Sequence, residues 1–344
     1  MRLVLLILPF FLCACKSKTT HEPKNIERSF YYWKSVFKLS AKEKYTLDTL
    51  KINTLYIKFF DVTWDSKSKM PFPIAQLIVR DSVYLQNNSF NIIPTIFITN
   101  ESIAKIDSAS TDDLATKIFS LEKLIAANNH FKKITEIEID CDWTAKTKYK
   151  YFALLSKLQK LDSNINFTAT IRLHQIKYAS STGVPPIKRG MLMCYNMGNL
   201  TNKNTKNSIL EIAELKKYIG DLQHYPLALD LALPLFDWKV HFSKDLFKGL
   251  IKDLPREGLT NKAFIKTDDI YLATKDTIIF GYNFNTGDII RVEESKYEEI
   301  LKTGTLIADK LKNKNLRLSL YHLDSVTLNK FTTHEMENIF DNFR

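Results

Sequence analysis

The chain has 344 residues, a formal net charge of +11 and 45% hydrophobic residues. This length is large for one simple domain but suits a barrel with insertions. The four cysteines and seven histidines have no zinc-ligand spacing, and no P-loop or GxGxxG sequence occurs, so no metal and no cofactor is expected. Lysines are spread along the chain, which indicates solvated helix faces; a weak attraction to anionic glycans or lipid head groups is the alternative.

The N-terminus has the layout of a secretory signal. One arginine precedes an apolar run over residues 3–11, which is too short to span a membrane. Leu12-Cys13-Ala14-Cys15 follows and resembles a bacterial lipobox, which implies cleavage before Cys15 and lipid attachment to its sulfur. An ordinary signal peptide with a chance cysteine is the alternative. We expect a signal peptide over 1–14, a tether over 15–27, and a lipid anchor in the bacterial cell envelope, on the outer membrane or a periplasmic face; this location disfavours nucleic acid.

Beyond the tether, hydrophobic runs alternate with amphipathic segments in a β-α rhythm. A helix is expected around 41–50, and another begins at Ser110 or Thr111 as its N-cap, with acidic residues in its first turn. Eight strands are expected, at 29–37, 54–64, 92–99, 134–143, 166–174, 190–197, 227–235 and 316–323. The pattern predicts an α/β fold, a (β/α)8 TIM-type barrel over residues 28–344.

The gap between the seventh and eighth strands is about 80 residues, too long for a simple connection. The short β-type runs in it lie at 263–265, 270–273, 277–282 and 288–292. The last two flank Asn283 to Gly287, which reads as a hairpin-like turn. We therefore expect a small β-rich insertion over about 240–312, ending in a helix over 296–311.

The fourth predicted strand reads ITEIEIDCDW, with a carboxyl group at every second position: Glu136, Glu138, Asp140 and Asp142. Successive side chains of a strand point to opposite faces, so these carboxyls are expected inside the barrel, with Asp142 nearest its C-terminal mouth. Burying them is costly unless they are hydrogen-bonded, paired or partly protonated. Closely spaced carboxyls separate each other's pKa values, so one becomes an acid while its neighbour stays ionised. A solvated acidic face on an antiparallel strand is the alternative.

All four tryptophans are expected at or near the C-terminal end of a strand: Trp33, Trp64, Trp143 and Trp238. Three of them have an aspartate as a direct neighbour, namely Asp65, Asp142 and Asp237. These strand ends gather on the face where barrel active sites form. Indoles stack on the apolar faces of sugar rings while carboxylates accept hydrogen bonds from hydroxyls, so the pattern predicts a carbohydrate ligand. The alternative is that some of these tryptophans pack under loops.

Further polar residues are expected at the same face, including Asp61, Tyr195, Asn196 and Tyr321. His174 is either a ligand contact or a satisfied core histidine. Arg172 shares its parity and is expected to neutralise part of the acidic row, which is a structural role. Asp230 also has inward parity and offers a second interior carboxyl. The cysteines of the predicted central strands, Cys141 and Cys194, are expected as small buried hydrophobes.

Together these residues resemble family 18 glycoside hydrolases, the chitinase-like barrels, whose fourth strand carries the signature DxxDxDxE. Glu138-Ile139-Asp140-Cys141-Asp142 has the same parity and puts Asp142 at the catalytic Glu. Met193-Cys194-Tyr195-Asn196 is similar to the family's M-x-Y-D, with Asn196 in place of Asp, and Leu233-Pro234-Leu235-Phe236 is similar to its Pro-aromatic segment. A different register puts Asp140 and Asp142 on the two aspartates and leaves Thr144 at the catalytic position. The family also often inserts a small domain between strands seven and eight. The chain looks as well like envelope lipoproteins with barrel domains, for which the resemblance implies no activity.

The resemblance implies a glycoside hydrolase on a lipid-anchored barrel, with Asp142 as general acid and Asp140 positioning a reacting group or holding a shared proton. The residues expected to contact the glycan are Glu138, Trp33, Asp61, Trp64, Trp143, His174, Tyr195, Asn196, Asp237, Trp238 and Tyr321. The alternative is a non-catalytic glycan-binding or structural lipoprotein on a degenerate hydrolase barrel, favoured by the missing Glu and by Asn196. Neutralisation of Asp140 and Asp142 by Arg172 or lysines would favour the binder, and a carboxyl that titrates near pH 6 would favour the enzyme.

Overall fold

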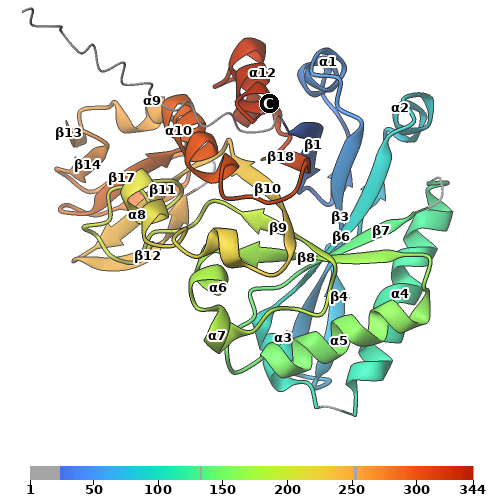
Figure 1. The fold of residues 1–344 in the computed structure, drawn as a ribbon. Coiled ribbons are helices and arrows are strands. Elements are labelled where there is room, and N and C mark those ends of the chain that lie inside the picture. The colour runs from blue at the N-terminus through green and yellow to red at the C-terminus, as the bar shows by residue number, and fades with distance from the viewer. Residues whose placement is uncertain (1–23, 108, 132–133, 252–253, 344) are drawn as a thin grey trace, which may run out of the picture.

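A computed structural model describes residues 24–107, 109–131, 134–251 and 254–343. Eight parallel strands follow one another around a closed ring in chain order (Figure 1): β1 (Asn25–Tyr32), β3 (Thr54–Asp65), β6 (Asn91–Ile98), β7 (Glu136–Asp140), β8 (Asn166–Arg172), β9 (Arg189–Met193), β10 (Ala228–Pro234) and β18 (Asn315–Tyr321). Pairing of β1 with both β18 and β3 closes the ring. The predicted (β/α)8 barrel is confirmed. The predicted signal peptide, Cys15 and most of the tether lie outside the described residues.

Helices and short turns surround the barrel, and the two long helices α4 and α5 pack against each other (Figure 1). The helix predicted to begin at Ser110 or Thr111 starts at Thr111 with Ser110 as N-cap. The bounds are α1 (Ala41–Thr49), α2 (Ser82–Asn87), α3 (Asn100–Lys105), α4 (Thr111–Asn128), α5 (Lys148–Leu161), α6 (Leu173–Lys177), α7 (Ala179–Thr182), α8 (Ile212–Lys216), the 3-10 turn η1 (Leu222–His224), α10 (Tyr297–Ala308), α11 (Ser325–Leu328) and α12 (Thr333–Asp341). Among the residues so described, no helix combines the length and apolarity that crossing a bilayer requires.

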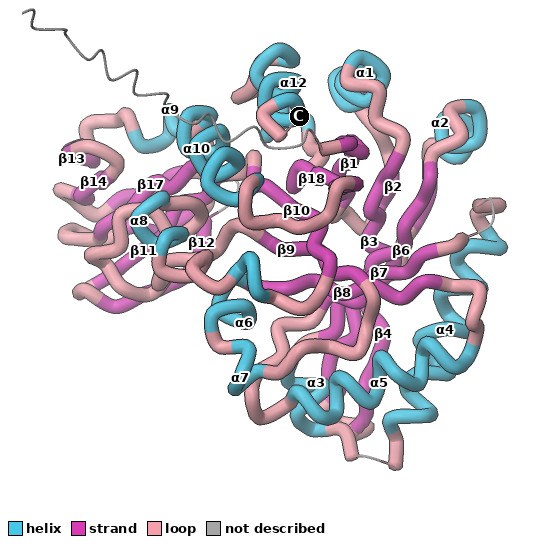
Figure 2. The backbone as a smooth tube through the Cα atoms, viewed as in Figure 1, coloured by secondary structure: helices cyan, strands magenta, loops and turns pink. Residues whose placement is uncertain are grey.

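Between β10 and α10 the chain forms a β-rich insertion, which Figure 2 shows beside the barrel strands. Its main sheet has the order β12-β11-β17-β14-β13 and is antiparallel. The strands are β11 (Asp237–Ser243), β12 (Leu246–Ile251), β13 (Phe264–Thr267), β14 (Ile270–Ala273) and β17 (Ile289–Glu294), and α9 (Arg256–Leu259) lies between β12 and β13. A separate apolar cluster that includes Leu254, Tyr271 and Ile290 forms its core. The predicted insertion between strands seven and eight is confirmed.

The hairpin of the insertion differs from the predicted one. Asn283 to Gly287 was expected to join two paired strands, but β15 (Thr277–Ile279) pairs with β16 (Tyr282–Phe284). Their two turn residues, Phe280 and Gly281, both have positive φ values, 49° and 81°. This is the backbone of a type I′ hairpin turn, whose twist matches that of the strands it joins. β17 pairs instead with β11 and β14, a long-range choice that local turn residues do not reveal.

The first and second barrel strands also carry additions. Residues 29–37 were expected as one strand, but β1 ends at Tyr32 and the chain turns before β2 (Val36–Phe37), which pairs with β5 (Ile78–Val79). β4 (Met70–Ile74) runs antiparallel to β3 and stands outside the ring. Trp33 therefore follows its strand instead of ending it, which places it at the mouth of the barrel.

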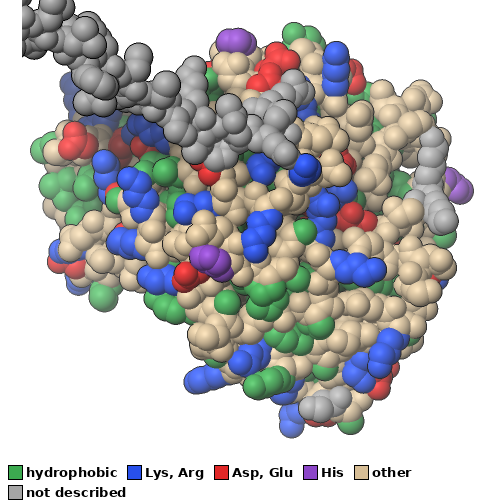
Figure 3. Space-filling model, in the orientation of Figure 1, with side chains coloured by type: hydrophobic (Ala, Val, Ile, Leu, Met, Phe, Trp, Pro, Cys, Tyr) green, Lys and Arg blue, Asp and Glu red, His purple; other side chains and the backbone are tan. Residues whose placement is uncertain are grey.

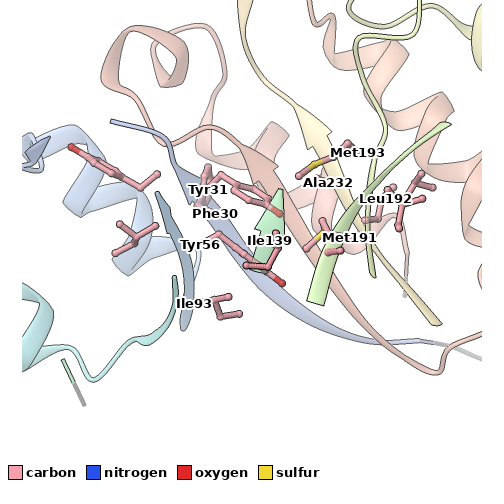
Figure 4. Close-up of a cluster of buried hydrophobic side chains, with 14 of the residues drawn as sticks. Phe30, Tyr31, Tyr56, Ile93, Ile139, Met191, Leu192, Met193 and Ala232 are labelled. Carbon is pink, nitrogen blue, oxygen red and sulfur yellow. The ribbon is translucent and has the colours of Figure 1, made fainter. Parts of the chain in front are cut away.

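The core is continuous through the barrel, and its centre is aromatic. Figure 4 shows Tyr31 and Tyr56 among the buried side chains there, and their rings stack with centroids 4.6 Å apart. Met191 and Met193 pack in the same cluster and are almost fully buried. Cys141 and Cys194 are free and buried, as expected of small hydrophobes. On the outside, Figure 3 shows Lys and Arg side chains spread over the visible face.

Candidate functional site

The acidic side chains of β7 point into the barrel, each with its own partners. Glu136 accepts from Arg317 of β18 at 3.0 Å, and Glu138 accepts from the Tyr31 hydroxyl at 2.8 Å. Asp140 accepts from the Thr170 hydroxyl at 2.6 Å. The alternative of a solvated acidic face is wrong, because β7 is parallel to both neighbours and its inward carboxyls are buried. Strand alternation alone therefore predicts this row of carboxyls.

Burial and mutual repulsion change the acidity of this row. Burial, and then the charge of Asp140, raise the pKa of Glu138 well above its usual value, although the bond from Tyr31 opposes the shift. Burial also raises the pKa of Asp140, while the positive charge of Arg172 opposes that shift. The interior therefore favours protonated carboxyls more than water does.

Asp142 follows the strand, and Arg172 pairs with it at the C-terminal mouth. The Arg172 Nε lies 2.5 Å from Asp142 Oδ1, and its Nη2 lies 3.4 Å from Asp140 Oδ1. The side chain of Arg172 is 17% exposed and that of Asp142 54%. One guanidinium therefore bridges the two aspartates, as the parity of Arg172 led us to expect.

A cavity of about 1480 Å³ opens above this bridge. It is lined by side chains from the strand ends, the insertion and the segment after β18. Nine of the residues predicted to form the site line it: Trp33, Asp61, Asp140, Asp142, Tyr195, Asn196, Asp237, Trp238 and Tyr321. The C-terminal strand ends thus gather these side chains as a parallel barrel requires.

Two of the predicted ligand contacts are corrected by burial. Trp143 is fully buried, stacks on Tyr151 at 5.2 Å and donates from Nε1 to the Thr182 carbonyl. It lies three residues after the end of β7 and packs against α5 instead of turning to the cavity. Glu138 is fully buried as well, and it lies two residues before Asp140, which lines the cavity. Neither residue lines the cavity.

Two others lie away from the cavity because the chain turns. β8 ends at Arg172, so His174 falls on α6 and faces solvent. Trp64 lies near the end of the long strand β3, where the Lys105 ammonium is 5.6 Å from its ring centroid. Both predictions assumed that the side chain at the end of a strand always lies at the barrel mouth. This is true only where the strand ends at the rim of the barrel.

Aromatic side chains form a wall along the cavity. The ring of Tyr321 is 5.7 Å from that of Trp33 and 5.1 Å from that of Tyr195. Phe236, which continues the wall, is 5.3 Å from Trp238. Such a run of rings presents several flat apolar faces to one ligand.

The insertion fixes the orientation of Trp238. Its Nε1 donates to Glu293 Oε2 at 2.7 Å, and Arg291 Nε donates to Glu293 Oε1 at 2.6 Å. Ser208 also donates to Glu293, and both Arg291 and Glu293 are almost fully buried. The indole is therefore held by a charged pair that sequence inspection did not single out.

Cationic residues of the cavity were also missed from the sequence. They come from β11, from α9, from the start of α10 and from the segment after α11: Lys239, Arg256, Lys296 and Lys330. They looked like part of the dispersed lysine population because they are far apart along the chain. The fold brings them to one side of the cavity.

Thr144 stands at the catalytic position if the family signature is aligned in its second register. It is exposed and belongs to a turn, where its amide donates to the Thr147 hydroxyl at 2.9 Å. Asn196 lines the cavity with a left-handed backbone, φ 53°, a conformation that asparagine tolerates well. Among the described residues, no group of three or more His, Cys, Asp or Glu side chains has a metal-binding arrangement.

Solved structures share this fold at low sequence identity. The spore cortex-lytic enzyme SleL of Bacillus cereus matches over 93% of this chain and 75% of its own, with 12% identity and a TM-score of 0.56. A chitinase from Bacteroides thetaiotaomicron matches over 93% of this chain and 97% of its own, with 13% identity and a TM-score of 0.57. A chitinase from Chromobacterium violaceum matches over 89% of this chain and 97% of its own, with 10% identity and a TM-score of 0.53.

No family model matches the sequence, and no curated protein matches it. At these identities the likeness is one of fold, and it covers nearly the whole described chain. It agrees with the resemblance drawn from β7, from the end of β9 and from the insertion. The chain therefore has the same barrel fold as these chitinases and the cortex-lytic enzyme.

Proposed function

We propose that this protein binds a carbohydrate chain in the cavity at the C-terminal ends of the barrel strands. The observation that carries the proposal is the composition of that cavity: a wall of aromatic rings faces a floor of carboxylates within one volume of about 1480 Å³. Sugar rings have flat apolar faces and a rim of hydroxyls, so they use both kinds of surface at once. The chitinases with the same fold are consistent with such a ligand.

Asp61 supports the proposal in atomic detail. Its Oδ2 accepts from the Lys58 ammonium at 3.0 Å, whereas its Oδ1 is buried and has no hydrogen-bond partner among the described residues. A buried acceptor without a donor is unfavourable. Asp61 and Trp33 both line the cavity, so a rotation of the Asp61 carboxylate toward the cavity would let a sugar hydroxyl supply that donor.

Binding without hydrolysis is the function we favour. A general acid must be free to reach the glycosidic oxygen, but the Asp142 carboxyl is engaged by the guanidinium of Arg172 at 2.5 Å. Thr144, at the catalytic position of the second register, has no acidic group. Arg172 contacts both aspartates, which is part of the neutralisation expected of a binder, although one guanidinium balances only one carboxylate.

Hydrolysis is the second candidate, and one observation favours it. Burial raises the pKa of Asp140, which favours its protonated form. Asp140 would then be the general acid in place of Asp142, which changes the role expected from the sequence. The mechanism would need Asp140 to reach the glycosidic oxygen from the cavity floor.

One experiment separates the two candidates. The full-length chain is titrated with β-linked oligosaccharides of the chitin and cellulose types, and both binding and released sugar are measured. We expect binding without release, unchanged in Asp113→Asn, a matched control whose exposed carboxylate pairs with Lys117 on α4. Release of sugar that is lost in Asp140→Asn would establish the hydrolase instead. Absence of binding to every glycan would overturn the proposal.

We also propose that Cys15 carries a lipid and anchors the protein in the bacterial envelope. The lipobox-like residues Leu12 to Cys15 support this proposal. Expression with a labelled fatty acid is expected to label the wild-type chain and not Cys15→Ser, and the variant should leave the membrane fraction. Labelling that persists in the variant would contradict the assignment of Cys15.

A further inference from the structure

Two lysines share a single aspartate on the insertion side of the cavity. Lys239 Nζ lies 3.2 Å from Asp237 Oδ2, and Lys330 Nζ contacts Asp237 Oδ1. Lys239 and Asp237 belong to β11, whereas Lys330 comes from the segment after α11. We call these three residues the lysine pair site. All three line the cavity.

The lysine pair site carries one excess positive charge. Burial would raise the pKa of Asp237, but the hydrogen bonds and charges of Lys330 and Lys239 lower it, so this carboxyl is ionised. Two ammonium groups and one carboxylate leave a net charge of one. The side chain of Lys239 is 5% exposed, so part of this charge is withdrawn from water.

A withdrawn ammonium is stable when anions or other acceptors surround it. An ammonium has three donors, and the described protein bonds give Lys239 a single acceptor, Asp237. The Glu294 carboxylate, which lines the same cavity, is already paired with Arg256, and Lys296 is paired with Asp269. The lysine pair site is therefore complementary to one further negative group that arrives from the cavity.

We infer that the lysine pair site binds an anionic substituent, a carboxylate or a sulfate, on the glycan that occupies the cavity. This inference rests on the proposed glycan-binding function and names its substrate class as an acidic glycan. Trp238 and Lys239 are successive residues of β11 and point to opposite faces of the strand, but both line the same cavity, so one glycan chain can contact the indole and the lysines at different points. The aspartates of the barrel mouth, in contrast, would repel such a group there, which gives the bound chain a direction.

The test uses matched ligands that differ in charge alone. The first series shares one β-linked backbone and consists of cello-oligosaccharides, their oligoglucuronate counterparts and their sulfated derivatives. The second series is a chitin-type oligosaccharide with and without carboxymethyl ether groups. Affinities for the full-length chain are measured by calorimetry at low and physiological salt. We expect an acidic member to bind at least tenfold more tightly than its neutral partner, and the carboxylate and sulfate arms tell which group is recognised.

Two substitutions with opposite signs make the result specific. Lys330→Gln is expected to weaken binding of the acidic glycan about tenfold while leaving the neutral partner nearly unchanged. Asp237→Asn removes the internal competitor and is expected to strengthen acidic binding. Lys160→Gln, which removes an exposed lysine at the end of α5, is the control for overall charge. Thermal unfolding of each variant confirms that it is folded.

The outcomes separate this inference from the function on which it rests. Neutral and acidic glycans bound with equal affinity, or a preference that both substitutions leave unchanged, would overturn the lysine pair site and leave glycan binding intact. An effect of Lys160→Gln as large as that of Lys330→Gln would reduce the preference to overall charge and also overturn the site. Absence of binding to every ligand would overturn both proposals.

Discussion

The two sides of the cavity have opposite charge and are built in different ways. At the barrel mouth a single guanidinium, that of Arg172, serves two aspartates, Asp140 and Asp142. At the lysine pair site the ratio is reversed, because Lys239 and Lys330 serve Asp237 alone. One side of the cavity is therefore deficient in cations and the other in anions. A ligand with hydroxyls at one end and a negative group at the other matches both sides.

The two sides also differ in how firmly the chain holds them. The mouth is built on consecutive parallel strands, and Thr170 and Arg172 of β8 reach the carboxyls of β7 directly across the sheet. The lysine pair site joins the insertion to the segment after α11, so it depends on how two connections meet. Barrels commonly keep the strand framework and vary the connections that shape ligand choice. We therefore propose that the mouth provides general glycan binding and the insertion side provides selectivity.

The largest effect is expected from removing the cation of the mouth. Arg172→Met leaves Asp140 buried beside Asp142 without a positive partner, and breaking a buried ion pair costs about 3–4 kcal/mol of unfolding free energy. The charge of Arg172 lowers the pKa of Asp140, so this pKa rises further in the variant. The loss should be greater at pH 8 than at pH 4, because the raised pKa lets the carboxyl of the folded variant take up a proton more readily at low pH.

The matched variant is Arg256→Met, on the insertion side. Arg256 pairs with Glu294 and its side chain is 47% exposed, so its removal is expected to cost less than about 1 kcal/mol. Urea denaturation of both variants at the two pH values measures the contrast. Equal losses would mean that the mouth and the insertion side are not held differently.

Glu122 of α4 gives the next effect, as a buried carboxyl that lacks the compensation seen at the mouth. Burial raises the pKa of Glu122 to about 7, although the charge of Lys123 opposes this shift. Its Oε1 is buried and has no hydrogen-bond partner among the described residues. The unfolded chain releases this proton at lower pH than the folded chain, so stability falls as pH rises from about 4.5 to about 7. The fall should be about 3 kcal/mol.

Glu122→Gln removes the titrating group and should flatten this part of the stability curve. Chemical denaturation of the variant and the wild type from pH 4 to pH 8 measures the difference, which should grow with pH and then level off. Glu101→Gln is the control, since that carboxyl is exposed on α3 and pairs with Lys105. Parallel curves for the Glu122 variant and the wild type would show that burial does not shift this group.

A smaller effect concerns the aromatic wall at the mouth. Trp33→Ala is expected to weaken the binding of neutral and acidic glycans alike, by about tenfold or 1.4 kcal/mol. The reason is that stacking on the sugar face does not involve the charged substituent. Trp64→Ala serves as its control, since Trp64 lies outside the cavity and should leave both affinities unchanged. Calorimetry with the matched ligands gives the two ratios. A loss confined to the acidic glycan would contradict the division of labour between the two sides.

The sequence predicted the mouth better than the insertion side, for a physical reason. Alternation in β7 is a local rule, so it placed Glu138 and Asp140 inside and allowed Arg172 to be expected opposite them. The same rule, applied to Trp143, would have directed that indole outward to Tyr151, but its neighbour Asp142 suggested a ligand contact instead. Local pattern was sufficient where a single strand decides the direction of the side chain.

Pairings between distant segments left no comparable signal. Lys239 and Lys330 meet on Asp237 although ninety-one positions of sequence separate the two lysines (330 minus 239). Arg291 and Glu293 hold Trp238 because β17 pairs with β11, and the sequence suggested a different hairpin for β17. Long-range strand order therefore decides the insertion side, and one sequence does not contain that order in readable form.

The smallest predicted effect tests whether the insertion side needs this fixed indole. Trp238→Phe keeps an aromatic face but removes the Nε1 donor to Glu293, and a lost hydrogen bond of this kind costs about 1 kcal/mol. Glu293 keeps Arg291 and Ser208 as partners, so the fold should persist. If the indole aligns the ligand for the lysine pair site, acidic glycans should weaken about fivefold and neutral ones less. Trp64→Phe is the matched control, and equal weakening of both glycans would mean that Trp238 supplies stacking area without directing the charged group.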